Sequence, residues 1–171
     1  GLDRAQALAN GIASGYASNI LKGQAVKYVT GGTIQPVTGT EAFVGAFDGA
    51  EWTDTTGRRR ISNYWPANTT GTAIVAYFYA DQNIVYEIQT DGTVDQTSLQ
   101  DEANLSNLTA GSTTTGLSQC TLSSTLAGAG NTAQMRIIDL APYADNAWGD
   151  SYVIVRANIS NYQIGPVAGV A

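Results

Sequence analysis

Acidic side chains are the first candidates for chemistry in this sequence. Glu87, Asp91 and Asp95 follow one another within a short stretch of the chain. Two facing carboxyl groups can hydrolyse a glycosidic bond, one acting as the acid and the other as base or nucleophile. Asp91, however, lies in a Thr-Asp-Gly sequence that is typical of a tight turn. We therefore expect no catalytic residues. A hydrolase that uses Glu87 and Asp91 remains the alternative.

A second acidic group lies in the loop ADNAWGD, residues 144–150. Asp145, Asn146 and Asp150 supply the oxygen atoms that Ca²⁺ prefers, but their spacing differs from that of the twelve-residue, helix-flanked calcium loop. We therefore expect no metal site. Tyr143, Asp145 and Trp148 of the same region can instead hold a glycan. This makes a glycan-binding module the alternative function.

The sequence contains no histidine and a single cysteine, Cys120. One chain therefore cannot form a Ser-His-Asp or Cys-His catalytic group, a histidine-containing metal site or an internal disulfide. Free cysteines are commonly small buried apolar residues, and we expect this for Cys120. We expect no cofactor.

Length and charge exclude further classes of protein. The 171 residues are enough for one ordinary domain. Eight Lys and Arg residues against fourteen Asp and Glu give a formal net charge of −6, which argues against nucleic acid as a partner. No apolar run approaches the roughly 20 residues that span a bilayer, so we expect no membrane association.

Short runs rich in β-branched and aromatic residues, separated by Gly, Asn and Asp, predict an all-β fold. We expect a single β-barrel or β-sandwich domain over residues 25–160. Pro36 predicts an edge strand or a bulge, and residues 101–105 are expected to form one helical turn. The expected strands are 25–29, 34–37, 41–53, 58–65, 72–80, 84–90, 133–140 and 151–158.

The two ends of the chain differ from this central part. Residues 1–24 contain few apolar residues, and Gly11 and Gly15 weaken any helix there. We expect an extended N-terminal arm that orders against a neighbouring subunit. Residues 161–171 are small and apolar, so this C-terminal tail is expected to form a second arm.

Three consecutive arginines follow the turn in WTDTTGRRRISNYWP, residues 52–66. On a strand, Arg58 and Arg60 lie on one side and Arg59 on the other, next to Ile61. The three side chains therefore do not converge on one anion. Cross-strand ion pairs explain them, with Asp48, Glu51 and Asp54 available on the preceding strand.

The alternative for this hairpin is a contact surface for a partner. Arginines next to tryptophan and tyrosine have the composition of an interface hot spot. The N-terminal arm is expected to add contacts of its own. The candidate contact residues are Tyr16, Ile20, Leu21, Trp52, Arg58, Arg60, Tyr64 and Trp65.

Several of these segments, in this order, resemble a family of tailed-bacteriophage virion proteins. They are FVGAFDGAEWTDTTGRR, ISNYWP, TAIVAYFYADQNIVYEIQTDG, TGLS, AQMRIIDL and DNAWGDSYVIVRAN, and together they cover roughly residues 20–160. The family comprises head proteins that are often described as capsid decoration or cement proteins. This chain departs from the family pattern at Ala80–Gln82 and at Asn161–Gln163.

The resemblance implies a structural, noncatalytic protein that binds and stabilises the mature capsid lattice. Its expected place is the outer surface of the capsid in the virion. Its expected partners are the major capsid protein and further copies of itself, as a homodimer or homotrimer. The resemblance implies no catalytic residues and no cofactor. The alternative function given above, glycan binding, would in this context be that of a tail- or fibre-associated glycan-binding adhesin.

Overall fold

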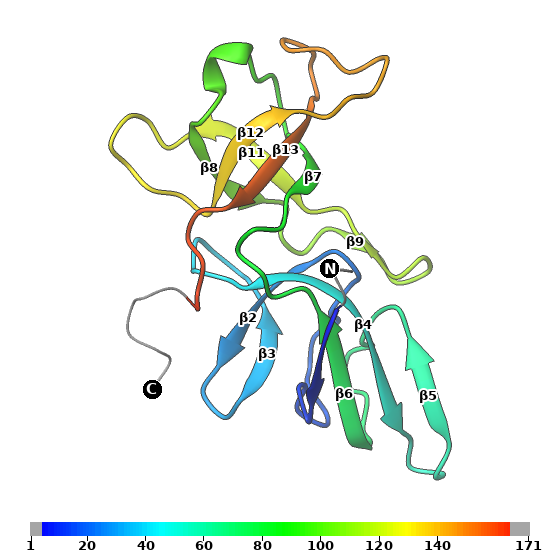
Figure 1. Cartoon of the computed structure of the whole chain (residues 1–171). Coiled ribbons are helices and arrows are strands. Elements are labelled where there is room, and N and C mark those ends of the chain that lie inside the picture. The colour runs from blue at the N-terminus through cyan, green and yellow to red at the C-terminus, as the bar shows by residue number, and fades with distance from the viewer. Residues whose placement is uncertain (1–4, 165–171) are drawn as a thin grey trace.

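The computed structural model describes residues 5–164 and shows two antiparallel sheets stacked end to end (Figure 1). Within this range the chain forms thirteen strands and one short 3-10 turn, η1 (Gln96–Ser98). The all-β prediction is thus confirmed. Neither sheet closes into a barrel over the described residues. No helix in this part of the chain has the length and hydropathy needed to span a membrane.

The first sheet contains the N-terminal strands and lies at the bottom of Figure 1. Its strand order is β1-β6-β4-β2-β3, and β5 pairs with the far end of β4. A register shift at Gly49 marks the bulge that the glycines of this segment predict. The strands are β1 (Gln6–Ala9), β2 (Ala25–Val29), β3 (Thr33–Pro36), β4 (Gly45–Thr53), β5 (Arg59–Ser62) and β6 (Thr72–Phe78).

The second sheet contains the C-terminal strands in the order β11-β8-β12-β13-β7. A small hairpin, β9 (Gly111–Ser112) and β10 (Leu117–Ser118), precedes β11. A parallel bridge joins Leu117 of this hairpin to Lys22, which lies just before β2 of the first sheet. The strands of the second sheet are β7 (Tyr86–Gln89), β8 (Glu102–Ser106), β11 (Thr121–Leu126), β12 (Met135–Leu140) and β13 (Ile154–Ile159).

Each sheet has its own hydrophobic core. Phe47, Trp65 and Phe78 are fully buried members of the first core. The second core contains Leu122, Ile137 and other residues of the second sheet, but also Ala25, Val37 and Phe43 from the first part of the chain. The two cores are therefore joined by residues of β2 and of the segment between β3 and β4.

Gln134, just before β12, also connects the two sheets. Its side chain is fully buried. Its Oε1 accepts a hydrogen bond from the backbone of Leu105, and its Nε2 donates to the backbone oxygens of Gly39 (3.1 Å) and Glu41 (2.8 Å). One amide side chain thus fixes the segment that follows β3 to the second sheet.

The eight predicted strands are present as β2 to β7, β12 and β13. Pro36 lies in β3, which is an edge strand as expected. The predicted helical turn at residues 101–105 is wrong, because this segment forms the inner strand β8. Ala103 and Leu105 of β8 are buried on one face, an alternation that the surrounding polar residues obscure.

The prediction of an extended N-terminal arm needs correction over residues 5–24. β1 pairs with β6 along Gln6–Ala9, and Ile12 and Ile20 are buried in the first core. Gly11 permits close packing there, because a Cβ at this position would lie 2.8 Å from that of Ala76. Gly11, which was predicted to weaken a helix, thus lets the segment pack against the sheet.

The start of the predicted C-terminal tail also packs against the first sheet. Tyr162 forms a bridge with Phe43, and its hydroxyl donates to the backbone oxygen of Ala80. The side chain of Gln163 bonds to both the N–H and the carbonyl of Tyr28. Residues 161–164 therefore do not form a free arm, and residues 165–171 lie outside the described part.

Candidate functional site

The β4–β5 hairpin ends in a turn that the Asp54 side chain holds in place. Asp54 Oδ1 accepts hydrogen bonds from the Thr56 hydroxyl (2.6 Å), the Thr56 N–H (2.9 Å) and the Arg58 N–H (3.0 Å). The Thr56 hydroxyl and the Arg60 guanidinium hold the pKa of Asp54 well below its usual value. The carboxylate is therefore ionised at neutral pH. By holding the turn, it fixes the position of the backbone at Arg58, the first of the three arginines.

Two of the three arginines pair with acids of the same hairpin. Arg60 Nε lies 2.7 Å from Asp54 Oδ2, and an Arg59 terminal nitrogen lies 2.7 Å from Glu51 Oε1. Hydrogen bonds to Glu51 lower its pKa; the bond from Arg59 has the larger effect and the bond from the Tyr77 hydroxyl the smaller. The predicted cross-strand pairs thus form with Glu51 and Asp54. Asp48 pairs with Lys22 instead.

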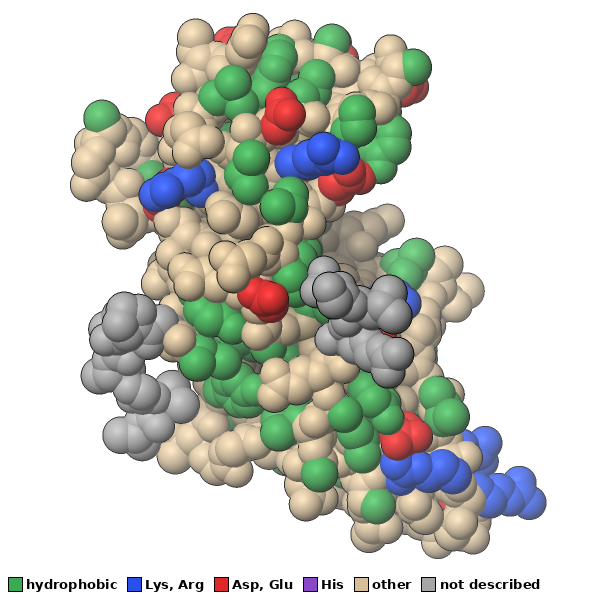
Figure 2. Space-filling model, viewed as in Figure 1, with side chains coloured by type: hydrophobic (Ala, Val, Ile, Leu, Met, Phe, Trp, Pro, Cys, Tyr) green, Lys and Arg blue, Asp and Glu red, His purple; other side chains and the backbone are tan. Residues whose placement is uncertain are grey.

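The remaining side of β5 faces solvent. β4 is its strand partner, and no second strand among residues 5–164 pairs with it. The Arg58 side chain forms no ion pair within the described range, and Ile61 is 80% exposed. Figure 2 shows one group of basic side chains at the lower right, over β5, apart from those in the upper part of the molecule. We call residues 58–61 the basic edge.

The basic edge includes only some of the predicted contact residues. Arg58 and Arg60 are exposed on it, and Tyr16 and Tyr64 are half-buried. The other predicted contact residues are buried within this chain and are not available to a partner, which corrects the prediction for Ile20, Leu21, Trp52 and Trp65.

The two tryptophans illustrate the reason for this error. The rings of Trp52 and Trp65 meet edge to face, with centroids 5.2 Å apart and planes at 70°. They form a packed pair inside the first core, which favours such geometry. Aromatic composition alone therefore did not distinguish a core pair from an interface. Ile61, which is not among the predicted contact residues, is the exposed apolar residue at this edge.

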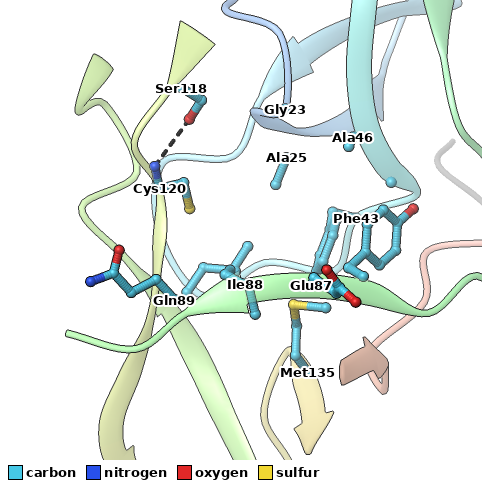
Figure 3. Close-up of a pocket in the computed structure, with 13 residues that line it drawn as sticks. Gly23, Ala25, Phe43, Ala46, Glu87, Ile88, Gln89, Ser118, Cys120 and Met135 are labelled. Carbon is cyan, nitrogen blue, oxygen red and sulfur yellow. Dashed lines mark hydrogen bonds between the residues drawn. The ribbon is translucent and has the colours of Figure 1, made fainter. Parts of the chain in front are cut away.

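A cavity of about 250 Å³ lies where the two sheets meet. Figure 3 shows Ala25 and Phe43 from the first part of the chain around this space, together with Ile88, Cys120 and Met135. Burial raises the pKa of the Cys120 thiol to about 11, so the thiol is protonated at neutral pH. Cys120 is half-buried and packs against the second core, where it serves as a small apolar residue.

The candidate hydrolytic acids belong to separate hydrogen-bond networks. Glu87 accepts from the Tyr143 hydroxyl (2.5 Å) and pairs with Arg156, and the Tyr143 contact lowers its pKa. Asp91 accepts from the N–H of Ser124. Hydrogen bonds outweigh the burial that would raise the pKa of Asp91, so its pKa is also lowered. A general acid needs a raised pKa, which neither group has.

In the loop after β12, Asn146 and Asp150 bond to backbone groups of the loop and of its two ends. The Asn146 side chain donates to the carbonyls of Ala141 and Ile154 and accepts from the Ile154 N–H. Asp150 accepts from the N–H of Ala147. Within the described residues, no group of three or more His, Cys, Asp or Glu side chains is placed to hold a metal ion.

The aromatic residues of this loop divide between the core and the surface. Trp148 is half-buried and packs against the second core, whereas Tyr143 and Tyr152 are exposed. Tyr152 was not among the residues predicted to hold a glycan in this loop. Its position just before the buried Val153 was the available signal, because side chains alternate as the chain enters a strand.

Comparison with known proteins gives no relative. No protein-family model, no curated protein and no solved structure matches this chain.

Proposed function

We propose that this protein is a structural component of a tailed-bacteriophage head that binds the mature capsid lattice from outside and stabilises it. It acts by binding rather than by catalysis. Its partners are the major capsid protein and further copies of itself in a symmetric oligomer. The proposal rests on the sequence resemblance described above, together with one structural observation, the basic edge.

The basic edge combines three properties in a chain whose net charge is −6. Three of the eight basic residues lie at this hairpin, Arg58 has no acidic partner among the described residues, and Ile61 is 80% exposed. A strand edge with free backbone groups can add to a partner's sheet. An uncompensated arginine and an exposed isoleucine on the same short edge favour an acidic partner with an apolar patch.

The same edge disfavours pairing with a second copy. If β5 paired with β5 of another chain, arginines would face arginines, and like charges placed across a strand pair are destabilising. Charged edges are a common protection against such pairing. We therefore assign the basic edge to the capsid protein and place the contacts between copies elsewhere on the molecule.

Binding would stabilise the shell through linkage. A protein that binds the mature lattice and not its precursor shifts the equilibrium toward the mature form by RT ln(1 + [L]/Kd) for each site. Attachment through an oligomer raises the effective concentration at neighbouring sites. Many individually weak contacts would then hold the mature form.

Cosedimentation with heads of the parent phage tests this function. The purified chain is mixed with expanded heads stripped of accessory proteins and, in parallel, with unexpanded proheads. We expect saturable binding to the expanded heads alone. The doubly substituted Arg58→Glu, Ile61→Asp protein should bind at least about tenfold more weakly, a change of ~1.4 kcal/mol.

The matched control is Val85→Asp, which places a charge at another exposed apolar position, on the second sheet side of the molecule. Val85 is 50% exposed, so the substitution should not affect the fold. Wild-type protein that binds neither particle would contradict the function. If the double variant bound expanded heads as tightly as wild type, capsid binding would stand, but the basic edge would not be the contact surface.

A further inference from the structure

We propose that the second sheet carries a binding site for a neutral saccharide. The site is a hollow of about 350 Å³ beside the end of β7 and the loop that joins β12 to β13. We call it the tyrosine hollow. Its lining residues are Gln89, Tyr143, Asp145, Asn146, Tyr152 and Ile154.

Two exposed aromatic rings line this one hollow. Tyr143 is 49% exposed and Tyr152 is 62% exposed, and both are among the most exposed large hydrophobic residues of the described chain. Leaving such rings in water forgoes the free energy of burying them. A pyranose ring presents C–H groups of slight positive charge, which suit the negative face of an aromatic ring. The two rings thus favour a ligand with a flat face of C–H groups, such as a pyranose.

Polar groups without internal partners lie beside these rings. The side chains of Gln89 and Asp145 are exposed, and neither forms a side-chain hydrogen bond or ion pair within the described residues. An amide both donates and accepts, and a carboxylate accepts, so the two together can bind adjacent sugar hydroxyls. Ligand sites typically combine an apolar lining with a few such groups.

The hollow is held in shape before any ligand arrives. The three hydrogen bonds of Asn146 to Ala141 and Ile154 fix the path of the loop. The Tyr143 hydroxyl donates to Glu87, which also pairs with Arg156 on β13. The loop and one of the two rings are therefore fixed in place, which lowers the entropic cost of binding.

The charges around the hollow select against anionic sugars. Asp145 lines it, and Glu87 accepts a hydrogen bond from Tyr143, which lines it as well. Arg156, the basic residue close to these groups, is already paired with Glu87. An acidic sugar would meet uncompensated negative charge, whereas a neutral sugar would not.

A second hollow lies beside Glu87, the residue that accepts the hydrogen bond of Tyr143. It has a volume of about 400 Å³ and is lined by Val85, Glu87, Ile138, Asp139 and Arg156. Glu87 therefore contacts both Tyr143 of the first hollow and the space of the second. A ligand of several sugar units can extend over both hollows, so an oligosaccharide should bind more tightly than its monosaccharide.

Titration with defined oligosaccharides tests the site. The probes are the neutral trisaccharides maltotriose, cellotriose, laminaritriose, mannotriose and chitotriose, with trigalacturonic acid as an anionic comparison. Binding is followed by the chemical shifts of the ¹⁵N-labelled full chain. We expect at least one neutral trisaccharide to bind saturably, more tightly than its monosaccharide, and trigalacturonic acid to bind least.

Three variants separate this site from nonspecific contact. Tyr152→Ala should weaken binding by about tenfold through the loss of one aromatic face. Tyr152→Phe, which keeps the ring, should bind like wild type. Ile61→Ala removes exposed apolar surface from the other sheet and should change nothing.

Two results would overturn the proposal: no neutral trisaccharide binds the wild-type chain, or Tyr152→Ala binds as well as Tyr152→Phe. Neither result bears on capsid binding by the basic edge, which lies on the other sheet.

Discussion

The side-chain nitrogen of Gln134 lies 2.8 Å from the backbone oxygen of Glu41, and this contact joins the two sheets of the protein. The same nitrogen bonds to Gly39, and the side-chain oxygen bonds to Leu105. All three contacts are shielded from water because Gln134 is fully buried. The segment that leads from β3 to β4 is thereby fixed against the strands of the second sheet.

Replacing Gln134 should therefore destabilise the whole chain. Gln134→Leu keeps most of the volume but leaves the N–H of Leu105 and two backbone oxygens without their partner. Each unsatisfied buried group costs about 1–3 kcal/mol, so we expect the free energy of unfolding to fall by about 3 kcal/mol or more. Urea unfolding monitored by circular dichroism measures this loss. Gln119→Leu, at an exposed position, should have little effect.

Glu41 should make the stability depend on acid pH. Lys27 Nζ lies 2.6 Å from Glu41 Oε1, and this hydrogen bond lowers the pKa of Glu41 from its usual 4.5 to about 2. A carboxyl group with a depressed folded pKa stabilises the fold fully above its unfolded pKa and loses this effect as the pH falls toward its folded pKa. The Glu41 contribution should therefore disappear between pH 4.5 and about 2.

The test is the midpoint of thermal unfolding measured across this pH range. Glu41→Gln should show a shallower decline than wild type, with a residual slope from other carboxyl groups of lowered pKa such as Glu51 and Glu87. Lys27→Met should reduce the slope in the same way, because it removes the cation that lowers the pKa. An unchanged slope in both variants would contradict the assignment.

Trp65 should contribute to stability and not to partner contact. It is fully buried, and its backbone exchanges hydrogen bonds with that of Ile20. Trp65→Ala should cost ~3–5 kcal/mol of unfolding free energy, as large-to-small core substitutions do. Trp65→Phe should cost less, because the indole N–H that it removes has no hydrogen-bond partner in the described residues. Chemical denaturation compares the two variants.

The exposed Ile61 provides the contrast for this series. Ile61→Ala should leave the unfolding free energy within about 0.5 kcal/mol of wild type. If Trp65→Ala changed the unfolding free energy as little as Ile61→Ala, it would contradict the assignment of Trp65 to the core.

Strand content was predictable from the sequence where β-branched and aromatic residues cluster. The segments around Ile74 to Phe78 and Ile154 to Ile159 have this composition, and both form strands. β8 and β11 were not predicted, because Asn104 and Ser123 and their neighbours supply polar residues at the outward positions. Their inward residues, such as Leu105 and Leu122, become informative only when the partner strand is known.

The candidate sites were predictable only in part. The pairing of Arg59 and Arg60 with acids of the same hairpin followed from strand geometry, and the structure confirms it. The burial of Trp52 and Trp65 did not follow, since composition does not determine which face of a hairpin packs against the rest of the chain. The tyrosine hollow depends on a loop conformation that Asn146 sets by tertiary hydrogen bonds, and no local pattern encodes those.

The return of the chain to the first sheet has a mechanical consequence. β1 pairs with β6, and Gln163 is bonded to Tyr28, so residues near both ends of the described range are held by the first sheet. Tension applied between these points is transmitted through the first sheet and bypasses the second. A force that pulls the two sheets apart instead loads residues 79–85, residues 160–162 and the Gln134 contacts in parallel. The connection between the sheets thus shares its load over several links, and the failure of one link leaves the others bearing force.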